Sequence, residues 1–514
     1  MMRFRDRFDR SKRTPTTRSQ RIGFAFFWLI VVMYAYFIPT QPSWNSESHL
    51  YPAFALVDHH TLNIDAYQRR LGDKSYANGH WYGDKAPGLT LLAVPVYALL
   101  REALPAQKAL PYEAFPHQKF AIPRSTIYLR YAITYILVIL PSALFAVFLW
   151  LFLCRFVSAG WALLATTVYS LGTIAWTFSS LYFSHQIAAI LLFVAFALLY
   201  RRAHDGSSGR LLRWAPVLAG ALCGLAVISE YPTAVIVVLL MAYTAITSSR
   251  RLRDTMAFAA GLCPPAIAGL AYNLAAFGHP LATGYMYEHS SLYQSTVKGG
   301  FLGFTNPLSY GAHAPSLLSA WQITFGAYRG IFLVSPVLLL FVAALVFMWR
   351  KRTVRAEFWL CLVIVVGYFL LDASRDWAVS GWSGGNSVAS RHLVPAIPFM
   401  VLPLVFGFTN SLFRRIFLIA GGVSIGIMFI IVSSVGLFSY TDQNPLVHEA
   451  LRHFSAGKMQ VNWGNTVGLT GFASLLPLAV IAAALSIRIG WLLHSSHETQ
   501  MTRREPLVTG LEAS

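Results

Sequence analysis

Charged residues are scarce in this chain of 514 residues, because Asp, Glu, Lys and Arg together make up only 12% of it. A soluble domain carries about 25% charged residues, so this composition excludes an ordinary soluble enzyme. Acidic residues are the rarer sign, with 21 Asp and Glu against 40 Lys and Arg. A net charge of +19 would suggest nucleic acid in a soluble chain. In a chain that is 56% hydrophobic it instead indicates the positive cytoplasmic side of a membrane protein, and we expect no nucleic-acid partner.

Cysteine is almost missing too, and all four cysteines fall in or at the end of an apolar run: Cys154, Cys223, Cys263 and Cys361. This excludes a framework of disulfides in the outer loops. No zinc-type spacing of His and Cys occurs. The run of Asp and His over residues 58–60 could bind a metal, but adjacent residues rarely share one ion. We therefore expect that no cofactor is required and that no metal ligands are present, with a divalent metal as the less favoured alternative.

What the chain has in abundance is long hydrophobic runs. A helix needs roughly 20 apolar residues to cross the hydrocarbon core of a bilayer. Twelve runs approach this length, with a range of eleven to thirteen because several are short. We therefore expect an all-α polytopic membrane protein with runs at 22–41, 127–153, 160–181, 185–200, 211–229, 232–248, 255–277, 327–349, 357–373, 393–411, 416–438 and 469–492.

The basic clusters predict how these runs are oriented. If the basic tail 1–21 is cytoplasmic and the runs alternate, then the clusters at 201–202, 250–253 and 350–352 all lie inside. The first run is about 20 residues long and no small-residue cleavage site follows it, so we expect a retained span, not a signal peptide. Both termini are then cytoplasmic, including the tail 493–514.

The outer loops of this topology are unequal in length. The first covers residues 42–126, and the other long ones cover 278–326, 374–392 and 439–468. Within the first loop, the apolar stretch 88–101 is too short to cross comfortably and is predicted to be an interfacial helix. Function tends to reside in loops that a rigid scaffold positions, so we expect the active site on the outer face.

Two carboxylates of the first outer loop are candidate catalytic residues. Glu47 follows the first run closely, and a carboxylate at the bilayer surface can act as a general base. Asp58 could assist or orient the substrate, although a solvated loop position explains either acid equally well. Other polar residues of this loop are candidates to line a substrate pocket: His49, Tyr51, His59, Tyr82 and Asp84.

Lys85 is the candidate cation of the same loop. It lies in a turn directly before the expected interfacial helix, which would place its ammonium at the depth of the lipid headgroups. An ammonium there can bind a lipid phosphate. A lysine that merely snorkels to the interface is the alternative.

Ionisable residues at the outer ends of later runs extend the candidate site. Arg329 and Arg391 run against the orientation bias, which makes them candidates to bind a specific anion. Glu230 lies with Tyr231 in a break between two apolar runs, where an acid is costly without a partner; an acid at a helix end in water is the alternative. Three further pocket candidates lie at or before the start of a run: His185, Trp382 and His392.

The order of these features resembles the GT-C glycosyltransferases that use polyprenyl-phosphate sugars, a group that includes protein O-mannosyltransferases and the bacterial 4-amino-arabinose lipid A transferases. Glu47 and Tyr51 match the group's Asp-Glu-x-x-Tyr pattern, with Glu47 in place of the leading Asp. Residues 84–87 resemble its Asp-Lys-Pro-Pro turn, and residues 391–395 resemble its late Arg-Tyr-x-x-Pro segment. Three further segments look like a bacterial branch of the group: 78–82, 229–232 and 328–330.

The resemblance covers roughly residues 22–411 and implies a GT-C-like catalytic core there, followed by C-terminal helices over 412–492. It implies a bacterial inner-membrane enzyme that moves a sugar from a polyprenyl-phosphate donor to a lipid, glycan or protein acceptor. Lys85, Arg329 and Arg391 would neutralise the departing phosphate. Glu47 would deprotonate the acceptor hydroxyl, which attacks the anomeric carbon from the opposite face and inverts it.

Two departures from the group leave the donor and the mechanism open. Relatives commonly carry an acid where this chain has His185, and the arabinose transferases tend to carry Lys where this chain has Glu230. The rival from another class is a secondary transporter or a flippase of lipid-linked glycans. Such a protein would place its ionisable residues at the middle of the bilayer, whereas those of this chain gather at the ends of the runs.

Overall fold

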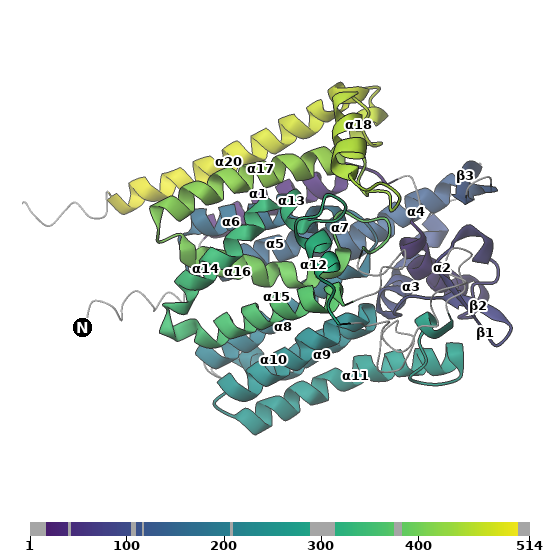
Figure 1. Cartoon of the computed structure of the whole chain (residues 1–514), viewed down its shortest axis with the longest axis horizontal. Coiled ribbons are helices and arrows are strands. Elements are labelled where there is room, and N and C mark those ends of the chain that lie inside the picture. Colours follow the sequence, from purple (N-terminus) through teal and green to yellow (C-terminus); the bar gives the residue numbers. More distant parts are fainter. Residues whose placement is uncertain are drawn as a thin grey trace, which may run out of the picture.

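The computed structural model describes residues 17–39, 43–103, 109–115, 118–205, 209–287, 314–374 and 383–501, most of which are helical (Figure 1). Among them, seven segments are long and apolar enough to cross a membrane: Thr126–Leu153, Ser184–His204, Arg210–Ser229, Arg251–Phe277, Arg352–Ala373, Ser411–Ser434 and Gly471–His494. Four apolar helical segments are shorter: Ala159–Leu171, Tyr231–Thr247, Pro336–Trp349 and Arg391–Gly407. The expectation of an all-α membrane protein is confirmed, whereas twelve spans stay a prediction.

The helices follow one another along the chain as α1 (Thr17–Ala35), α2 (Trp44–His59), α3 (Gly88–Leu100), α4 (Arg124–Thr134), α5 (Leu140–Leu153), α6 (Ala159–Leu171), α7 (Ala175–Ser179), α8 (Ser184–His204), α9 (Arg210–Ser229), α10 (Ala234–Thr247), α11 (Arg251–Phe277), α12 (Leu317–Thr324), α13 (Ile331–Val334), α14 (Leu340–Trp349), α15 (Arg355–Ala373), α16 (Ile397–Gly407), α17 (Ser411–Ser434), α18 (Arg452–Ser455), α19 (Trp463–Thr466) and α20 (Leu476–Met501). Two short 3-10 turns precede spans at the candidate site: η6 (Tyr231–Thr233) and η10 (Arg391–Ala396).

Two of the expected runs are broken helices. The run 160–181 divides into α6 and α7, because the chain leaves the helix at Gly172. The run 327–349 divides into α13 and α14, with a 3-10 turn that begins at Pro336 between them. Proline lacks the amide hydrogen that a helix interior needs, so the second break follows directly from the sequence.

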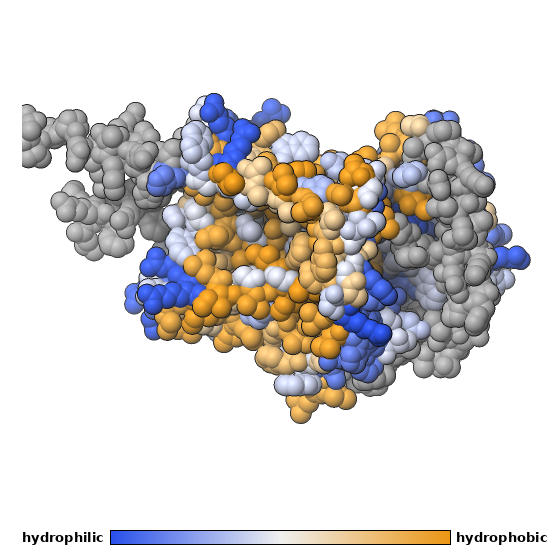
Figure 2. All heavy atoms as spheres, turned by 90° about the horizontal axis from the view of Figure 1, so that it is seen from above, coloured by the Kyte–Doolittle hydropathy of each residue, from blue (hydrophilic) through white to orange (hydrophobic). Residues whose placement is uncertain are grey.

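The surface is consistent with a chain that crosses a bilayer. Figure 2 shows a broad hydrophobic band over the helical body, with hydrophilic side chains gathered toward its two ends. Large apolar side chains point outward along the helices, as Ile267, Val342 and Ile419 do. Exposed apolar area of this extent would be unstable in water and indicates contact with lipid.

The first and last helices lie side by side, so the two described chain ends are at the same end of the body (Figure 1). Near that end, Arg18 Nε donates to the carbonyl of Leu492 at 2.6 Å. The opposite end carries α2, α3 and a hairpin made of β1 (Lys74–Ala77) and β2 (His80–Gly83) (Figure 1). The described residues of the expected first loop therefore form a lobe at the end of the body away from the described chain ends.

A small apolar core joins this lobe to the body, because it includes both lobe residues and the body residues Ile133 and Tyr182. Helices α2 and α3 pack on each other and enclose Phe54, Leu89 and Tyr97. Helix α3 coincides with the apolar stretch for which an interfacial helix is expected. Strand β1 (Lys74–Ala77) pairs antiparallel with β2 (His80–Gly83), and β3 (Ala109–Phe115) pairs with β4 (Gln118–Pro123). The β1–β2 turn uses Asn78 and Gly79, both with positive φ (53° and 84°), as a tight hairpin turn requires.

Candidate functional site

A pocket lies where the first-loop lobe meets the helical body. It is lined by Asn45, His49, Lys85, Ala86, Ser184, His185, Ser229, Glu230, Tyr285, Arg391 and His392. These residues come from α2, the turn before α3, the start of α8, the end of α9 and the break after it, the 3-10 turn η7 (Gly284–Tyr287) and the start of η10. Six of the residues expected at a site from the sequence are therefore brought together, although they are spread over most of the chain.

Lys85 is positioned by carboxylates on the protein side. Its Nζ lies 2.6 Å from Asp84 Oδ2 and 3.1 Å from Asp73 Oδ2. Asp84 is fully buried and accepts a hydrogen bond from Ser48 Oγ at 2.6 Å. Burial raises the pKa of the Asp84 carboxyl, while the neighbouring Lys85 ammonium lowers it. Asp84 thus anchors the lysine and does not itself line the pocket.

A close backbone contact brings the Lys85 turn against the segment that carries Glu230. A Cβ added at Gly88 would lie 2.8 Å from the backbone nitrogen of Ser229, which is closer than real Cβ contacts allow. Only glycine fits this approach at the start of α3. The glycine therefore sets how near Lys85 comes to Glu230.

Glu230 and two histidines form the polar centre of the pocket. The chain leaves the helix at Glu230 (φ −154°, ψ 95°), just before Pro232. Glu230 Oε2 accepts a hydrogen bond from Ser184 Oγ at 2.8 Å and lies 3.6 Å from His185 Nε2. The rings of His185 and His392 have centroids 5.5 Å apart.

The same three side chains could hold a metal ion. His185, Glu230 and His392 each offer one ligand atom, and these atoms all lie within 4.8 Å of one another. Among the described residues, this is the group of three His, Cys, Asp or Glu side chains whose ligand atoms are close enough to share one ion. Sequence reasoning treated them as separate pocket residues, because nothing in their spacing shows that they meet.

Arg391 supplies the second cation of the pocket. It is 9% exposed, and its guanidinium carbon lies 5.4 Å from the centroid of the Phe183 ring. The polar turn before it uses positive φ at Gly384 and Gly385 (71° and 65°). The guanidinium is therefore held on an aromatic face with its charge toward the pocket.

Two cations, Lys85 and Arg391, line the pocket, and Asp84 and Asp73 balance much of the Lys85 charge from behind. His49 is buried, and burial lowers the pKa of its imidazole well below the usual value. The nearby Lys85, His185 and Arg391 lower it further. Because Glu230 is the only carboxylate among the lining residues, the pocket favours an anionic ligand.

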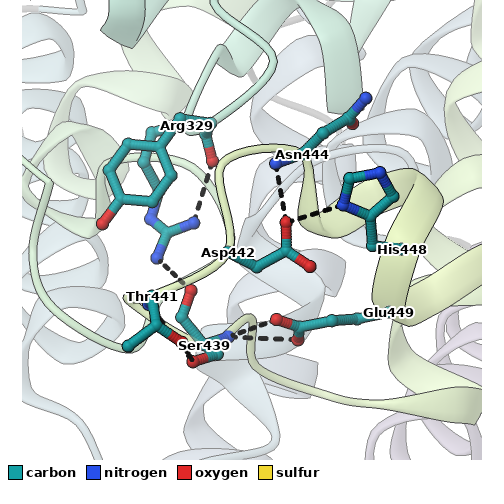
Figure 3. Close-up of polar contacts among 8 residues, drawn as sticks. Arg329, Ser439, Thr441, Asp442, Asn444, His448 and Glu449 are labelled. Carbon is teal, nitrogen blue, oxygen red and sulfur yellow. Dashed lines mark hydrogen bonds and ion pairs between the residues drawn. The ribbon is translucent and has the colours of Figure 1, made fainter.

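Arg329, expected to bind phosphate, lies outside the pocket lining. It is 1% exposed, and its guanidinium donates to the carbonyls of Tyr328 (2.8 Å), Gly385 (3.0 Å) and Ser439 (2.9 Å). Figure 3 shows it pointing at the loop that carries Ser439. Arg329 thus ties that loop to the turn before Arg391, which makes it a positioning residue.

The loop that Arg329 contacts, residues 439–449, carries its own polar network, which the sequence did not predict. Glu449 accepts hydrogen bonds from the Ser439 amide at 3.1 and 3.2 Å. Asp442 Oδ1 accepts from the Asn444 amide at 2.8 Å and lies 3.0 Å from His448 Nδ1 (Figure 3). These contacts fold the start of the expected outer loop 439–468 on itself. The bonds from Arg329 to the Ser439 carbonyl and from the Tyr440 amide to Asn386 attach it to the body.

Glu47, the expected base, is held in a buried ion pair beside the pocket. It is fully buried, and its Oε1 accepts a hydrogen bond from Arg130 Nη1 at 2.9 Å. Tyr51, one turn along α2, stacks on Tyr67 with centroids 5.0 Å apart. Burial and the neighbouring Glu47 carboxylate raise the pKa of the Tyr51 phenol. Neither residue lines the pocket, and Arg130 was missed by sequence reasoning.

Asp58 and His59 lie at the far end of α2, away from the pocket lining. Asp58 accepts hydrogen bonds from the Tyr97 hydroxyl at 2.6 Å and from Arg101 at 3.0 Å, and His59 is exposed. The remaining expected residues divide between buried packing positions and the part of the chain that is not described. Tyr82 packs on Phe277, Tyr231 packs on Tyr285, and Trp382 lies outside the described residues.

Comparison with known proteins adds no assignment to this geometry. No protein-family model matches the chain, and no curated protein sequence matches it.

Proposed function

We propose that this chain is an integral membrane glycosyltransferase that moves a sugar from a polyprenyl-phosphate donor to an acceptor at the outer membrane surface. The observation that carries the proposal is the pocket in which Lys85, Arg391 and Glu230 converge. Its place at the junction of the lobe and the body suits a donor whose isoprenoid tail lies among helices and whose headgroup is polar. The outer orientation is part of the proposal and follows from the basic clusters.

The two cations suit the leaving group of this reaction. As the glycosidic bond breaks, a lipid monophosphate gains negative charge, which fixed cations stabilise. Arg391 can bind two phosphate oxygens at once, and Lys85 adds a point charge. Both side chains are anchored from behind, Lys85 by carboxylates and Arg391 on an aromatic ring, so little reorganisation accompanies the reaction.

Glu230 is the carboxylate best placed to take the acceptor's proton. It lines the pocket, whereas Glu47 is paired with Arg130. A hydroxyl that donates its proton to Glu230 can attack the anomeric carbon while the phosphate departs on the opposite face, with inversion. We therefore assign the proton transfer to Glu230 and a structural role to Glu47.

The distribution of buried charge favours this proposal over a transporter. In the described spans, buried charged side chains lie near helix ends: Arg202 in the last turn of α8, Asp254 in the first turn of α11, Glu357 and Asp372 at the two ends of α15. Arg202 Nε donates to Asp254 at 2.8 Å. A transport site would need such groups near the middle of the bilayer.

The test first identifies the product in cells and then measures sugar transfer by the purified protein and by variants of the pocket residues. Mass spectrometry of surface glycolipids and glycoproteins, with and without the chain, should identify a missing sugar. The purified protein, given the matching polyprenyl-phosphate sugar and that acceptor, should then transfer it. Lys85→Met and Arg391→Met should each lower the transfer rate about 10²-fold or more, whereas the exposed Arg101→Met should not. Unchanged glycans, or substrate movement across vesicles without transfer, would contradict the proposal.

A further inference from the structure

We propose that His185, Glu230 and His392 form a binding site for a divalent transition metal, for which Zn²⁺ is the best match. Two imidazoles and one carboxylate are donor types that zinc prefers. One ligand atom from each side chain lies within 4.8 Å of the other two. The site lies in the pocket described above and not in the Asp-His-His run that the sequence offered.

The distances need only a small contraction to bind an ion. Zinc bonds of about 2.0–2.1 Å at a tetrahedral angle place neighbouring ligand atoms about 3.3 Å apart. His185 Nε2 and Glu230 Oε2 are already 3.6 Å apart. The rest of the contraction falls on His392, which is only partly buried and whose ring is tilted 53° from that of His185. Rotation about its side-chain bonds can bring it closer.

Helix packing and a hydrogen bond hold the proposed ligand side chains in place. His185 is in the first turn of α8 and 2% exposed, and η10, which carries His392, packs against α8. Ser184 Oγ donates to Glu230 Oε2 at 2.8 Å, which orients the carboxylate toward His185. Such hydrogen bonds to a ligand are a regular feature of metal sites.

The charge around the proposed zinc site favours an anion at the fourth coordination position of the ion. Lys85 contacts both Asp84 and Asp73, so its charge is largely balanced. Zinc with one carboxylate keeps a net positive charge, and Arg391 lines the same pocket. Three protein ligands leave a fourth position open, as in zinc sites that bind reactants. We expect hydroxide or a phosphate oxygen there. In the zinc-bound protein that hydroxide, and not the ligand Glu230, would take the acceptor's proton, and the phosphate would be that of the donor; this sentence alone rests on the proposed function.

Metal content of the full-length protein tests the site directly. The protein is purified without a polyhistidine tag, stripped with chelator, reloaded with Zn²⁺ or Co²⁺, and dialysed. We expect about one zinc per chain by elemental analysis, and visible absorption from Co²⁺ in a four- or five-coordinate site. Removal of one ligand, as in His185→Ala or His392→Gln, should weaken zinc binding about tenfold or more.

Two further variants separate the site from adventitious binding and from misfolding. His59→Ala removes an exposed histidine of the first loop and should leave zinc binding unchanged. His392→Cys replaces one zinc ligand by another and should restore binding, with Co²⁺ absorption shifted by the thiolate. Substoichiometric zinc, or equal zinc in His185→Ala, His392→Gln and the parent, would overturn the site. A protein that transfers sugar but takes up no zinc on reloading would refute the metal site alone. A protein that binds zinc but transfers no sugar would refute the proposed function alone.

Discussion

The buried pair of Glu47 and Arg130 offers a sharp test of what the first-loop carboxylate does. Both side chains are almost completely removed from solvent, at 0% and 9% exposed, and their atoms are 2.9 Å apart. Arg130→Met leaves the Glu47 carboxylate buried without its cation, and loss of one partner of such a pair costs about 3–5 kcal/mol of stability. Glu47→Gln leaves the guanidinium unpaired in the same way and should cost a comparable amount.

The double variant separates the pair from its members. In Glu47→Leu with Arg130→Met, neither charge is buried, and replacement of a buried ion pair by apolar residues is often neutral or stabilising. We expect the double variant to be more stable than Arg130→Met alone. The assay is thermal unfolding of the purified protein in one detergent, followed by tryptophan fluorescence at a fixed scan rate.

Two results would refute this reasoning. If Arg130→Met and Glu47→Gln both unfold like the parent protein, then the pair does not hold α2 to α4. If Glu47→Gln also abolishes sugar transfer at unchanged stability, then Glu47 is the base and the assignment of Glu230 is wrong.

Three other substitutions test the geometry around the pocket. Gly88→Ala should lower both stability and transfer, because its Cβ would meet the Ser229 backbone at 2.8 Å; parent-like unfolding would contradict the close approach. Arg329→Met should destabilise by about 3 kcal/mol or more, because three carbonyls lose a buried donor group; proteolysis between residues 436 and 449 should quicken, and unchanged cleavage would count against its positioning role. Asp58→Asn should change stability by less than about 1 kcal/mol and leave transfer intact, because its Arg101 partner is exposed and an Asn oxygen can still accept the Tyr97 hydrogen bond; loss of transfer would return Asp58 to the catalytic set.

The helices were largely predictable because hydropathy reports which segments avoid water, whether they face the protein interior or lipid. The run 211–229 is α9 (Arg210–Ser229), and the run 357–373 falls within α15 (Arg355–Ala373). The break of the run 160–181 at Gly172 was not foreseen, because a glycine within an apolar run reads equally well as a packing position. Hydropathy therefore located the helices better than it located their interruptions.

The candidate site was predictable only in part, because the sequence does not show toward which neighbour a side chain points from its helix. Position at the ends of apolar segments predicted that Lys85, Glu230 and Arg391 lie at the same end of the body, and these three line one pocket. It did not give the direction in which each side chain leaves its helix, so Glu47 and Arg329 were expected in the pocket but face other partners. Those partners, Arg130 and three backbone carbonyls, have no sequence signature.

The pairing of α1 with α20 has a consequence for how the chain is assembled. Trp463 Nε1, at the start of α19, donates to the carbonyl of Ala35 at the end of α1 at 2.9 Å, and Arg18 near the start of α1 donates to the carbonyl of Leu492 in α20. At about 5–20 residues per second, the ribosome needs roughly 20–90 s to make the chain between them. Helix α1 can pack on α5 early, but its other face waits in lipid or against an insertion factor until α20 has been made. Assembly of this bundle therefore depends on a contact between helices whose syntheses are separated by most of the described chain.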